Sequence, residues 1–260
     1  MRYQLTVLFL LINIICYANN KNPAWGLTGH RVVGEIAYNH LTKKAKRNLE
    51  NLINGEGLAI ISTYADDIKS DKNFKKFSSW HYVNFKVGDT YETSEKNSKG
   101  DIIYAINECQ RIISHPDSSK EDKVFYIKLL VHFLGDLHQP LHIGRAEDRG
   151  GNSISVKWFG KSTNLHSVWD TKMIESFNMS YSELTSNLDK FSKKQKNAIQ
   201  QGTVLDWVRE SRELAMKVYE SVKVDENLSY RYMYDYFFIV KNQLQKAGLR
   251  LAKILNEILG

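Results

Sequence analysis

The sequence has few of the residues that cross-link or interrupt a chain. It contains two cysteines and three prolines in 260 residues. Two cysteines are too few for the disulfide framework that holds many small secreted domains together, and three prolines leave long stretches free to form uninterrupted helices. The chain is long enough for one well-buried domain and short for two. Its stability must therefore come from a hydrophobic core or from bound metal.

The apolar run near the N-terminus is too short to cross a membrane. It extends from Leu5 to Ile15, eleven positions, whereas a helix needs ~20 residues to span ~30 Å of hydrocarbon. Arg2 precedes the run and polar residues follow it, which is typical of a secretory signal peptide. We expect residues 1–24 to be a signal peptide and residues 25–260 to form the mature domain.

Removal of the signal peptide changes the charge and the cysteine content. Residues 1–24 include Arg2, Lys21 and Cys16, so the net charge falls from +7 to +5 and Cys109 is the only cysteine left. Cys109 lies in an apolar helical stripe, which predicts a core residue rather than a reactive thiol. The remaining positive charge favours anionic partners such as nucleic acid, but only weakly. We expect an exported protein, periplasmic or secreted, without stable membrane association.

Helical periodicity dominates the rest of the chain. Steps of three and four separate the apolar residues between Phe237 and Ile258, as in an amphipathic helix. Strand alternation is nearly confined to Asn152–Phe159, which predicts a short hairpin, and Lys86–Gly100 reads as a polar loop. We predict an all-α fold, a mainly helical single domain with one short β-hairpin. Weaker helical patterns cover 30–53, 101–114, 121–137, 167–177 and 204–222.

Histidine is unevenly distributed along the sequence. Four of the eight histidines lie between His132 and Asp170, a stretch of 39 residues in which uniform scatter would place about one. His132 and Asp136 are four residues apart, as are His166 and Asp170. Each pair would project from one face of a helix, one turn apart, and could close on a single ion. Imidazole nitrogen and carboxylate oxygen suit zinc, so the cluster indicates a metal site and, through it, a hydrolase.

Six segments in this order resemble the zinc-dependent single-strand nucleases. They are WGLTGHRVVGEIA, YADDIK, WHYVN, HFLGDLHQPLH, DRGGNSISVKWFG and NLHSVWD. That family includes the fungal nucleases S1 and P1 and the plant bifunctional nucleases, and it belongs to the phospholipase C-like superfamily. The resemblance covers nearly the whole chain after residue 24. It implies a helical fold that holds three zinc ions.

The resemblance also implies a ligand set. One zinc ion would take Asp66, His81, His132 and Asp136, and a second would take His142, His166 and Asp170. The third would take His30, Asp136 as a bridge, and the free amine and carbonyl oxygen of Trp25. The free amine requires Trp25 to be the mature N-terminus. Cleavage after Ala24 would provide it, whereas cleavage after Ala18 would do so only if residues 19–24 were then trimmed.

Residues with catalytic or substrate-binding roles follow from the same resemblance. Asp136 and Asp66 would belong to the catalytic centre, where zinc activates a water for attack on phosphorus. Lys69 stands where fungal members carry a phosphate-contacting arginine. Tyr82 occupies the position of an aromatic that stacks on a nucleobase, with simple packing as the alternative. Asn84 replaces an aspartate that contacts the base edge, which leaves base preference open.

The expected activity is hydrolysis of single-stranded DNA and RNA to 5′-phosphorylated products, with 3′-nucleotides as further substrates of a monomeric enzyme. A zinc phospholipase C or a mixed-substrate phosphodiesterase is the alternative. That branch places its first histidine farther from the N-terminal tryptophan and carries glutamate at the position of Asp170. A non-enzymatic zinc-binding domain would need closed four-ligand sites, whereas the second set has three protein ligands.

Two residues near the predicted ligands and the cysteine content also bear on this assignment. Asp67 adjoins Asp66 but falls outside the family pattern, and His138 lies within the histidine cluster yet matches no ligand position, so we read His138 as structural. The lack of disulfide-forming cysteines differs from the eukaryotic members and leans toward a bacterial exported form.

Overall fold

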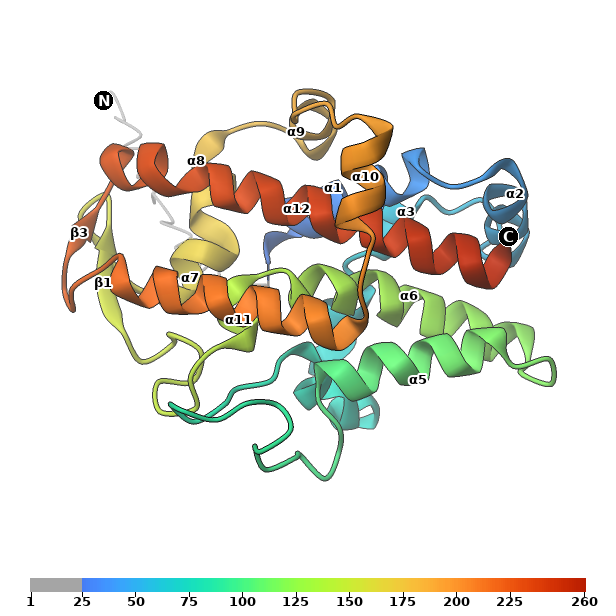
Figure 1. The fold of residues 1–260 in the computed structure, drawn as a ribbon, viewed down its shortest axis with the longest axis horizontal. Coiled ribbons are helices and arrows are strands. Elements are labelled where there is room, and N and C mark those ends of the chain that lie inside the picture. The colour runs from blue at the N-terminus through green and yellow to red at the C-terminus, as the bar shows by residue number, and fades with distance from the viewer. Residues whose placement is uncertain (1–24) are drawn as a thin grey trace, which may run out of the picture.

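The computed structural model describes residues 25–260, so the expected signal peptide lies outside the described residues. The long helices are α1 (Gly26–Asn39), α2 (Lys43–Leu52), α5 (Ile102–Ser114), α6 (Lys120–Leu137), α11 (Val204–Glu220) and α12 (Tyr230–Leu259). They are joined by the short helices α3 (Leu58–Ile61), α4 (Tyr64–Asp67), α7 (Leu165–Ser167), α8 (Met173–Phe177), α9 (Tyr181–Ser186) and α10 (Lys193–Ile199). Three 3₁₀ segments, η1 (Ile68–Ser70), η2 (Lys72–His81) and η3 (Pro140–Ile143), and the π-helical turn η4 (Val168–Lys172) complete the helical part (Figure 1).

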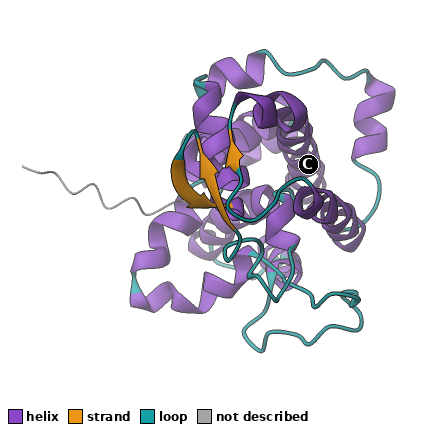
Figure 2. Ribbon diagram, turned by 90° about the vertical axis from the view of Figure 1, so that its left-hand side faces the viewer, coloured by secondary structure: helices purple, strands orange, loops and turns teal. Residues whose placement is uncertain are grey.

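A small sheet lies at one end of the helical body (Figure 2). Strand β1 (Ser155–Trp158) pairs antiparallel with β2 (Lys161–Asn164), which confirms the predicted hairpin. A third strand, β3 (Asn227–Leu228), pairs parallel with β1 and was not predicted. Two residues are too few to show an alternating pattern, so only the pairing partner reveals this strand. The mainly helical fold class is confirmed.

Side-chain caps explain where most of the long helices begin. Asp101 accepts hydrogen bonds from the backbone N–H groups of Ile103 and Tyr104 and thereby starts α5, because such a cap satisfies donors that have no intrahelical partner. Ser119 caps α6 in the same way. The helical pattern over 30–53 is divided between two helices, since the chain turns after Asn39 and Thr42 caps α2.

Helix α6 is the centre of the core. Every residue from Leu129 to Leu137 is buried, so the second half of the helix is covered on all sides. Figure 1 shows α6 between α5 and α12, and α1 packs against both α6 and α12. The polar side chains of His132 and Asp136 therefore lie inside the protein rather than on its surface. Among the described helices, none has the length and apolarity needed to span a membrane.

Candidate metal centre

Eight side chains from distant parts of the sequence converge at the C-terminal end of α6. They come from α1, α4, the end of η2, α6, η3, α7 and η4, and they are the eight side chains predicted as ligands: His30, Asp66, His81, His132, Asp136, His142, His166 and Asp170. Most are fully buried, and His166 is the most accessible. A cluster of buried imidazoles and carboxylates is what a metal site needs.

Asp136 lies at the middle of the deeper group. Its Oδ2 atom is 2.8 Å from His81 Nδ1 and 3.1 Å from His132 Nε2, while its Oδ1 atom is 3.4 Å from His30 Nε2. Asp66 Oδ1 approaches the same two imidazoles, at 3.6 Å from His132 Nε2 and 3.9 Å from His81 Nδ1. Asp136 thus faces two sides with its two oxygens, as a bridging carboxylate would.

Gly135 allows His30 to reach this group. The rings of His30 and His132 stack with centroids 3.8 Å apart. A Cβ atom at residue 135 would lie 2.8 Å from His30 Nδ1, which is closer than such atoms can approach. A larger residue there would force the His30 ring to shift from its place in the cluster.

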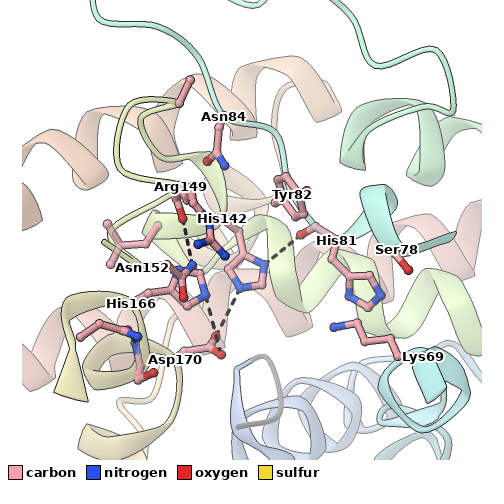
Figure 3. A pocket seen from close by; sticks show the side chains of 14 residues that line it. Lys69, Ser78, His81, Tyr82, Asn84, His142, Arg149, Asn152, His166 and Asp170 are labelled. Carbon is pink, nitrogen blue, oxygen red and sulfur yellow. Dashed lines mark hydrogen bonds and ion pairs between the residues drawn. The ribbon is translucent and has the colours of Figure 1, made fainter. Parts of the chain in front are cut away.

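A second group lies beside the first, nearer the surface. His142 Nε2 is 3.3 Å from Asp170 Oδ1, and His166 Nε2 is 4.0 Å from Asp170 Oδ2 (Figure 3). Asp170 belongs to the π-helical turn η4, a type of backbone irregularity that is frequent at functional sites. Gln139 Nε2 donates to Asp170 Oδ1 at 3.2 Å and so helps to fix the carboxylate. Sequence reasoning did not single out Gln139.

Trp25 is placed differently from its predicted role. Its indole is buried, and its backbone N–H donates a hydrogen bond to Asp170 Oδ1 in the second group. The prediction put the Trp25 nitrogen with His30 and Asp136 instead. In the chain as described, this nitrogen is a peptide amide, which donates a proton and has no lone pair for a metal. Processing at this position would convert it to an amine.

Hydrogen bonds to backbone carbonyls fix which imidazole nitrogens carry protons. The Nδ1 atoms of His132, His142 and His166 each lie 2.8 Å from a carbonyl oxygen, those of Ser62, His81 and Gly150 respectively. A carbonyl only accepts, so each Nδ1 donates, and in the neutral ring Nε2 presents a lone pair. These Nε2 atoms point at carboxylate oxygens, which also present lone pairs.

Several atoms of the cluster are buried without a hydrogen-bond partner. They include both ring nitrogens of His30, Nε2 of His142 and Oδ1 of Asp136. Leaving buried polar atoms unpaired is costly, and lone pairs that face one another require positive charge between them. The nitrogen and oxygen donor set fits zinc. The residues present therefore fit a bound metal.

The pKa values of the clustered side chains also indicate that the cluster is stabilised by positive charge. Burial lowers the pKa of His142, but the carboxylates of Asp136 and Asp170 outweigh it and raise that pKa to about 9. Burial raises the pKa of Asp136, but the neighbouring His132 and His142 hold it well below its usual range. Burial, together with the neighbouring His132, lowers the pKa of His30 and outweighs the opposing effect of Asp136 and Asp66. The Asp136 carboxylate is thus held ionised at the centre of the cluster.

The second group opens into a cleft of about 550 Å³. Figure 3 shows Lys69, Tyr82 and Asn84 on its wall, and all three were predicted to bind substrate. Lys69 Nζ is 2.5 Å from Asp66 Oδ1. The Tyr82 side chain is 43% exposed, so it is not simply core packing. Asn84 Oδ1 is buried without a partner.

The cleft also contains residues for which the sequence suggested no role. Arg149 and Asn152 face the same space (Figure 3). Both belong to the DRGGNSISVKWFG segment, which supported the family resemblance but gave these two residues no role. Arg149 has a left-handed backbone with φ of 56°, which is uncommon outside glycine. This turn also presents the Gly150 carbonyl to His166.

Comparison with known proteins agrees with the fold and the cluster. The profile of the S1/P1 nuclease family matches residues 25–260. The chain is 30% identical to Endonuclease 3 of Arabidopsis thaliana, over 99% of this chain and 97% of that protein, and 27% identical to Endonuclease 2 of the same plant, over 98% of each. It is 32% identical to Nuclease P1 of Penicillium citrinum over 57% of this chain and 58% of that protein.

The chain thus combines a helical domain and a candidate metal centre with a family profile that matches all of its described residues. The protein belongs to the S1/P1 nuclease family. It is a hydrolase that acts on phosphodiester bonds of nucleic acids. The relatives named here are plant and fungal proteins, and they lend no support to the expected bacterial origin.

Proposed function

We propose that the protein is an exported zinc-dependent endonuclease that cleaves single-stranded DNA and RNA to 5′-phosphorylated products and also removes the 3′-phosphate of nucleotides. One observation carries the proposal most directly. Buried lone pairs of histidines and aspartates face one another beside a cleft whose wall holds Lys69, Arg149 and the half-exposed ring of Tyr82. Metal ligands, phosphate-binding cations and a stacking platform thus meet in one place.

Three zinc ions would be held by the residues of the cluster. The first would take Asp66, His81, His132 and Asp136; the second would take His142, His166 and Asp170; the third would take His30, Asp136 and the main chain of Trp25. When bound, zinc lowers the pKa of water and stabilises charge on a phosphate. The central position of Asp136 and the three carbonyl-fixed imidazoles support this assignment.

The chain's own residues would bind and orient the substrate. Lys69 pairs with Asp66 in the structure, and its charge becomes available to a phosphate once Asp66 binds a cation. Arg149 offers a second cation on the opposite wall of the cleft. Tyr82 would stack on a base, which tolerates any sequence. The unpaired Asn84 Oδ1 would accept a hydrogen bond from a base edge.

Export and processing would complete the third zinc site. Helix α1 begins at Gly26, directly after Trp25, and the family match begins at residue 25. Cleavage after Ala24 would give Trp25 a free amine within the cluster. N-terminal sequencing of the exported protein together with its zinc content tests this step. A start at Trp25 with about three zinc ions is expected, and a start at Asn19 with two would contradict the third site.

The activity is tested with matched substrates and zinc-loaded protein. Single-stranded DNA, single-stranded RNA, duplex DNA and a 3′-nucleotide would be offered beside phosphatidylcholine. We expect 5′-phosphorylated fragments from the single strands, slow attack on the duplex and no diacylglycerol. Release of diacylglycerol without nucleotides would support the phospholipase C alternative, and inactivity on every substrate would support a structural zinc-binding domain.

A further inference from the structure

A shelf of aromatic and basic side chains lies beyond the cleft, at the first turn of α5. We propose that a single-stranded nucleic acid continues past Tyr82 and stacks on Tyr104, while Lys76 and Lys99 bind its phosphates. The shelf would be a subsite for nucleotides outside the scissile bond. The proposal rests on the proposed function for the chemistry of the ligand.

Shared wall residues connect the shelf to the metal centre. A hollow of about 480 Å³ borders the cleft and has Tyr82, Asn84 and Ala146 in common with it. A further hollow of about 570 Å³ shares Asp101 and the Lys96–Asn97 segment with the first hollow. The three depressions therefore adjoin one another in order from Asp170 to Tyr104.

The ring of Tyr104 is exposed but held in place. Its side chain is 48% exposed, and the ring meets Trp80 edge to face with centroids 5.4 Å apart. Trp80 Nε1 donates to the Lys99 carbonyl at 2.7 Å, which anchors the indole beneath. A Cβ atom at Gly100 would lie 2.3 Å from the Tyr104 ring, so this glycine lets the ring rest against the backbone. A fixed, exposed ring is a good platform for base stacking.

The charges around the shelf favour a polyanion. Lys76 and Lys99 are exposed, and neither forms an ion pair in the part of the chain that the structure describes. The two acidic residues that line the hollow at Tyr104 are already engaged: Glu108 accepts two hydrogen bonds from Arg111, both at 2.7 Å, and Asp101 caps α5, whereas Asp89 and Glu95 line the neighbouring hollow. Free cations beside an exposed aromatic ring are the pattern expected for single-stranded nucleic acid.

Three consecutive residues fix the shelf relative to the metal centre. Trp80 supports Tyr104, His81 joins the Asp136 group, and Tyr82 stands in the cleft. The Cα atoms of Trp80 and Tyr82 are at most ~7 Å apart, because two residues reach no farther. A strand that occupies the cleft would therefore meet Tyr104 within a few nucleotides.

Substrate length separates the shelf from the catalytic centre. Zinc-loaded wild type and Tyr104→Ala would be compared on a dinucleotide and on a single-stranded 12-mer. We expect the KM of the 12-mer to rise about ten-fold in Tyr104→Ala, which is the size of one stacking contact, while the dinucleotide changes less than about two-fold. Tyr104→Phe keeps the ring and should restore the wild-type KM. Tyr230→Ala, which removes a more exposed tyrosine at the start of α12, is the control.

Salt dependence tests the two lysines. The double variant Lys76→Ala/Lys99→Ala should reduce the slope of log affinity against log salt for the 12-mer by about 1.4, at ~0.7 for each phosphate contact. Lys193→Ala/Lys194→Ala on α10 removes the same charge elsewhere and should leave the slope nearly unchanged.

The outcomes distinguish this proposal from the proposed function. If Tyr104→Ala affects both substrate lengths equally, or if Tyr104→Phe fails to rescue, the shelf is not a subsite. If wild type cleaves neither substrate, the nuclease assignment fails. The shelf can then still be tested by binding, since fluorescence anisotropy measures the affinity of each protein for a labelled 12-mer. Equal affinity of wild type and Tyr104→Ala would overturn the shelf proposal.

Discussion

Two buried polar clusters lie at the C-terminal end of α6: the Asp136 cluster with its histidines, and a cluster of His138, Arg250 and Glu210. They differ in what faces each histidine ring nitrogen. His138 donates from Nδ1 to the Leu134 carbonyl at 2.8 Å, and its Nε2 accepts from Arg250 Nη1 at 2.8 Å. Arg250 in turn donates to Glu210 at 2.5 Å. His132, only six residues earlier, donates from Nδ1 in the same way but points its Nε2 at carboxylates.

The difference shows what separates a structural histidine from a candidate ligand. Burial, with the Arg250 charge, holds the pKa of His138 well below its usual range, so the ring is neutral and both nitrogens have partners. At His132 burial also lowers the pKa, but Asp136 and Asp66 outweigh it and raise that pKa. A donor completes the His138 cluster, whereas a cation is needed to complete the Asp136 cluster. The reading of His138 as structural agrees with these contacts.

Loss of Asp136 should have the largest effect. Asp136→Ala removes the carboxylate shared by two proposed zinc sites, so we expect about two fewer zinc ions per chain and a fall in kcat/KM of at least ~1000-fold, since a metal supplies several kcal/mol of charge stabilisation. Zinc analysis and nuclease kinetics measure both. Asp67→Ala is the matched control, because Asp67 is exposed and, among residues 25–260, its side chain accepts a hydrogen bond only from Thr63. Full zinc content in Asp136→Ala would contradict the bridging role.

Removal of the metal should destabilise the whole domain. A chelator leaves lone pairs facing one another in the core, and binding of zinc at about 1,000 times its Kd stabilises the native state by about 4 kcal/mol. We therefore expect the Tm to fall by about 10 °C in chelator and to return when zinc is restored, as calorimetry would show. An unchanged Tm would mean that the Asp136 cluster does not bind metal.

Loss of Arg250 should break the other cluster alone. Arg250→Met leaves His138 Nε2 without its donor and Glu210 with Lys246 as its remaining partner, so we expect a loss of about 2–3 kcal/mol in the free energy of unfolding. Zinc content and activity of the folded protein should stay the same. Lys253→Met, on the same helix and more exposed, should cost less than about 0.5 kcal/mol. A fall in zinc content in Arg250→Met would show that the two clusters are not independent.

The smallest expected effect is a change in acid stability. Burial raises the pKa of Glu210, but hydrogen bonds from Lys246 and Arg250 outweigh it and lower that pKa below its ordinary value of 4.5. Because the pKa of Glu210 is lower in the folded state than in the unfolded state, its ionised form stabilises the fold at pH values above the unfolded-state pKa. This stabilisation is lost as the pH falls through the folded-state pKa. Glu210→Gln should therefore lose stability at pH 7 and show a shallower decline below pH 4.5 in urea titrations. Parallel acid limbs for both proteins would contradict this role.

The sequence predicted the helical elements well where periodicity and caps agree. The patterns over 101–114, 121–137 and 204–222 correspond to α5, α6 and α11. It did not predict the break between α1 and α2, because His40 and Thr42 interrupt the helix without proline or glycine. Strand β3 was missed because a strand of two residues has no pattern of its own.

The candidate site was predicted through motifs, and the structure added the groups around them. Six sequence segments suggested the eight side chains that converge on α6, but they gave no hydrogen-bond partner for any imidazole. The Ser62, His81 and Gly150 carbonyls are backbone groups, so no residue type marks them. Gln139 and Arg149 were overlooked because their roles depend on where their neighbours fold.

The sequence by itself determined a mainly helical chain with one hairpin, and its motifs identified the histidines and aspartates that could bind metal. Side-chain spacing on one helix is local, so His132 with Asp136 was readable without a fold. Only the tertiary structure shows how they come together, since helix packing brings His30 to Asp136 and stacks its ring on His132. It also decided that His138 meets Arg250 instead of a carboxylate, because α12 covers that side of α6.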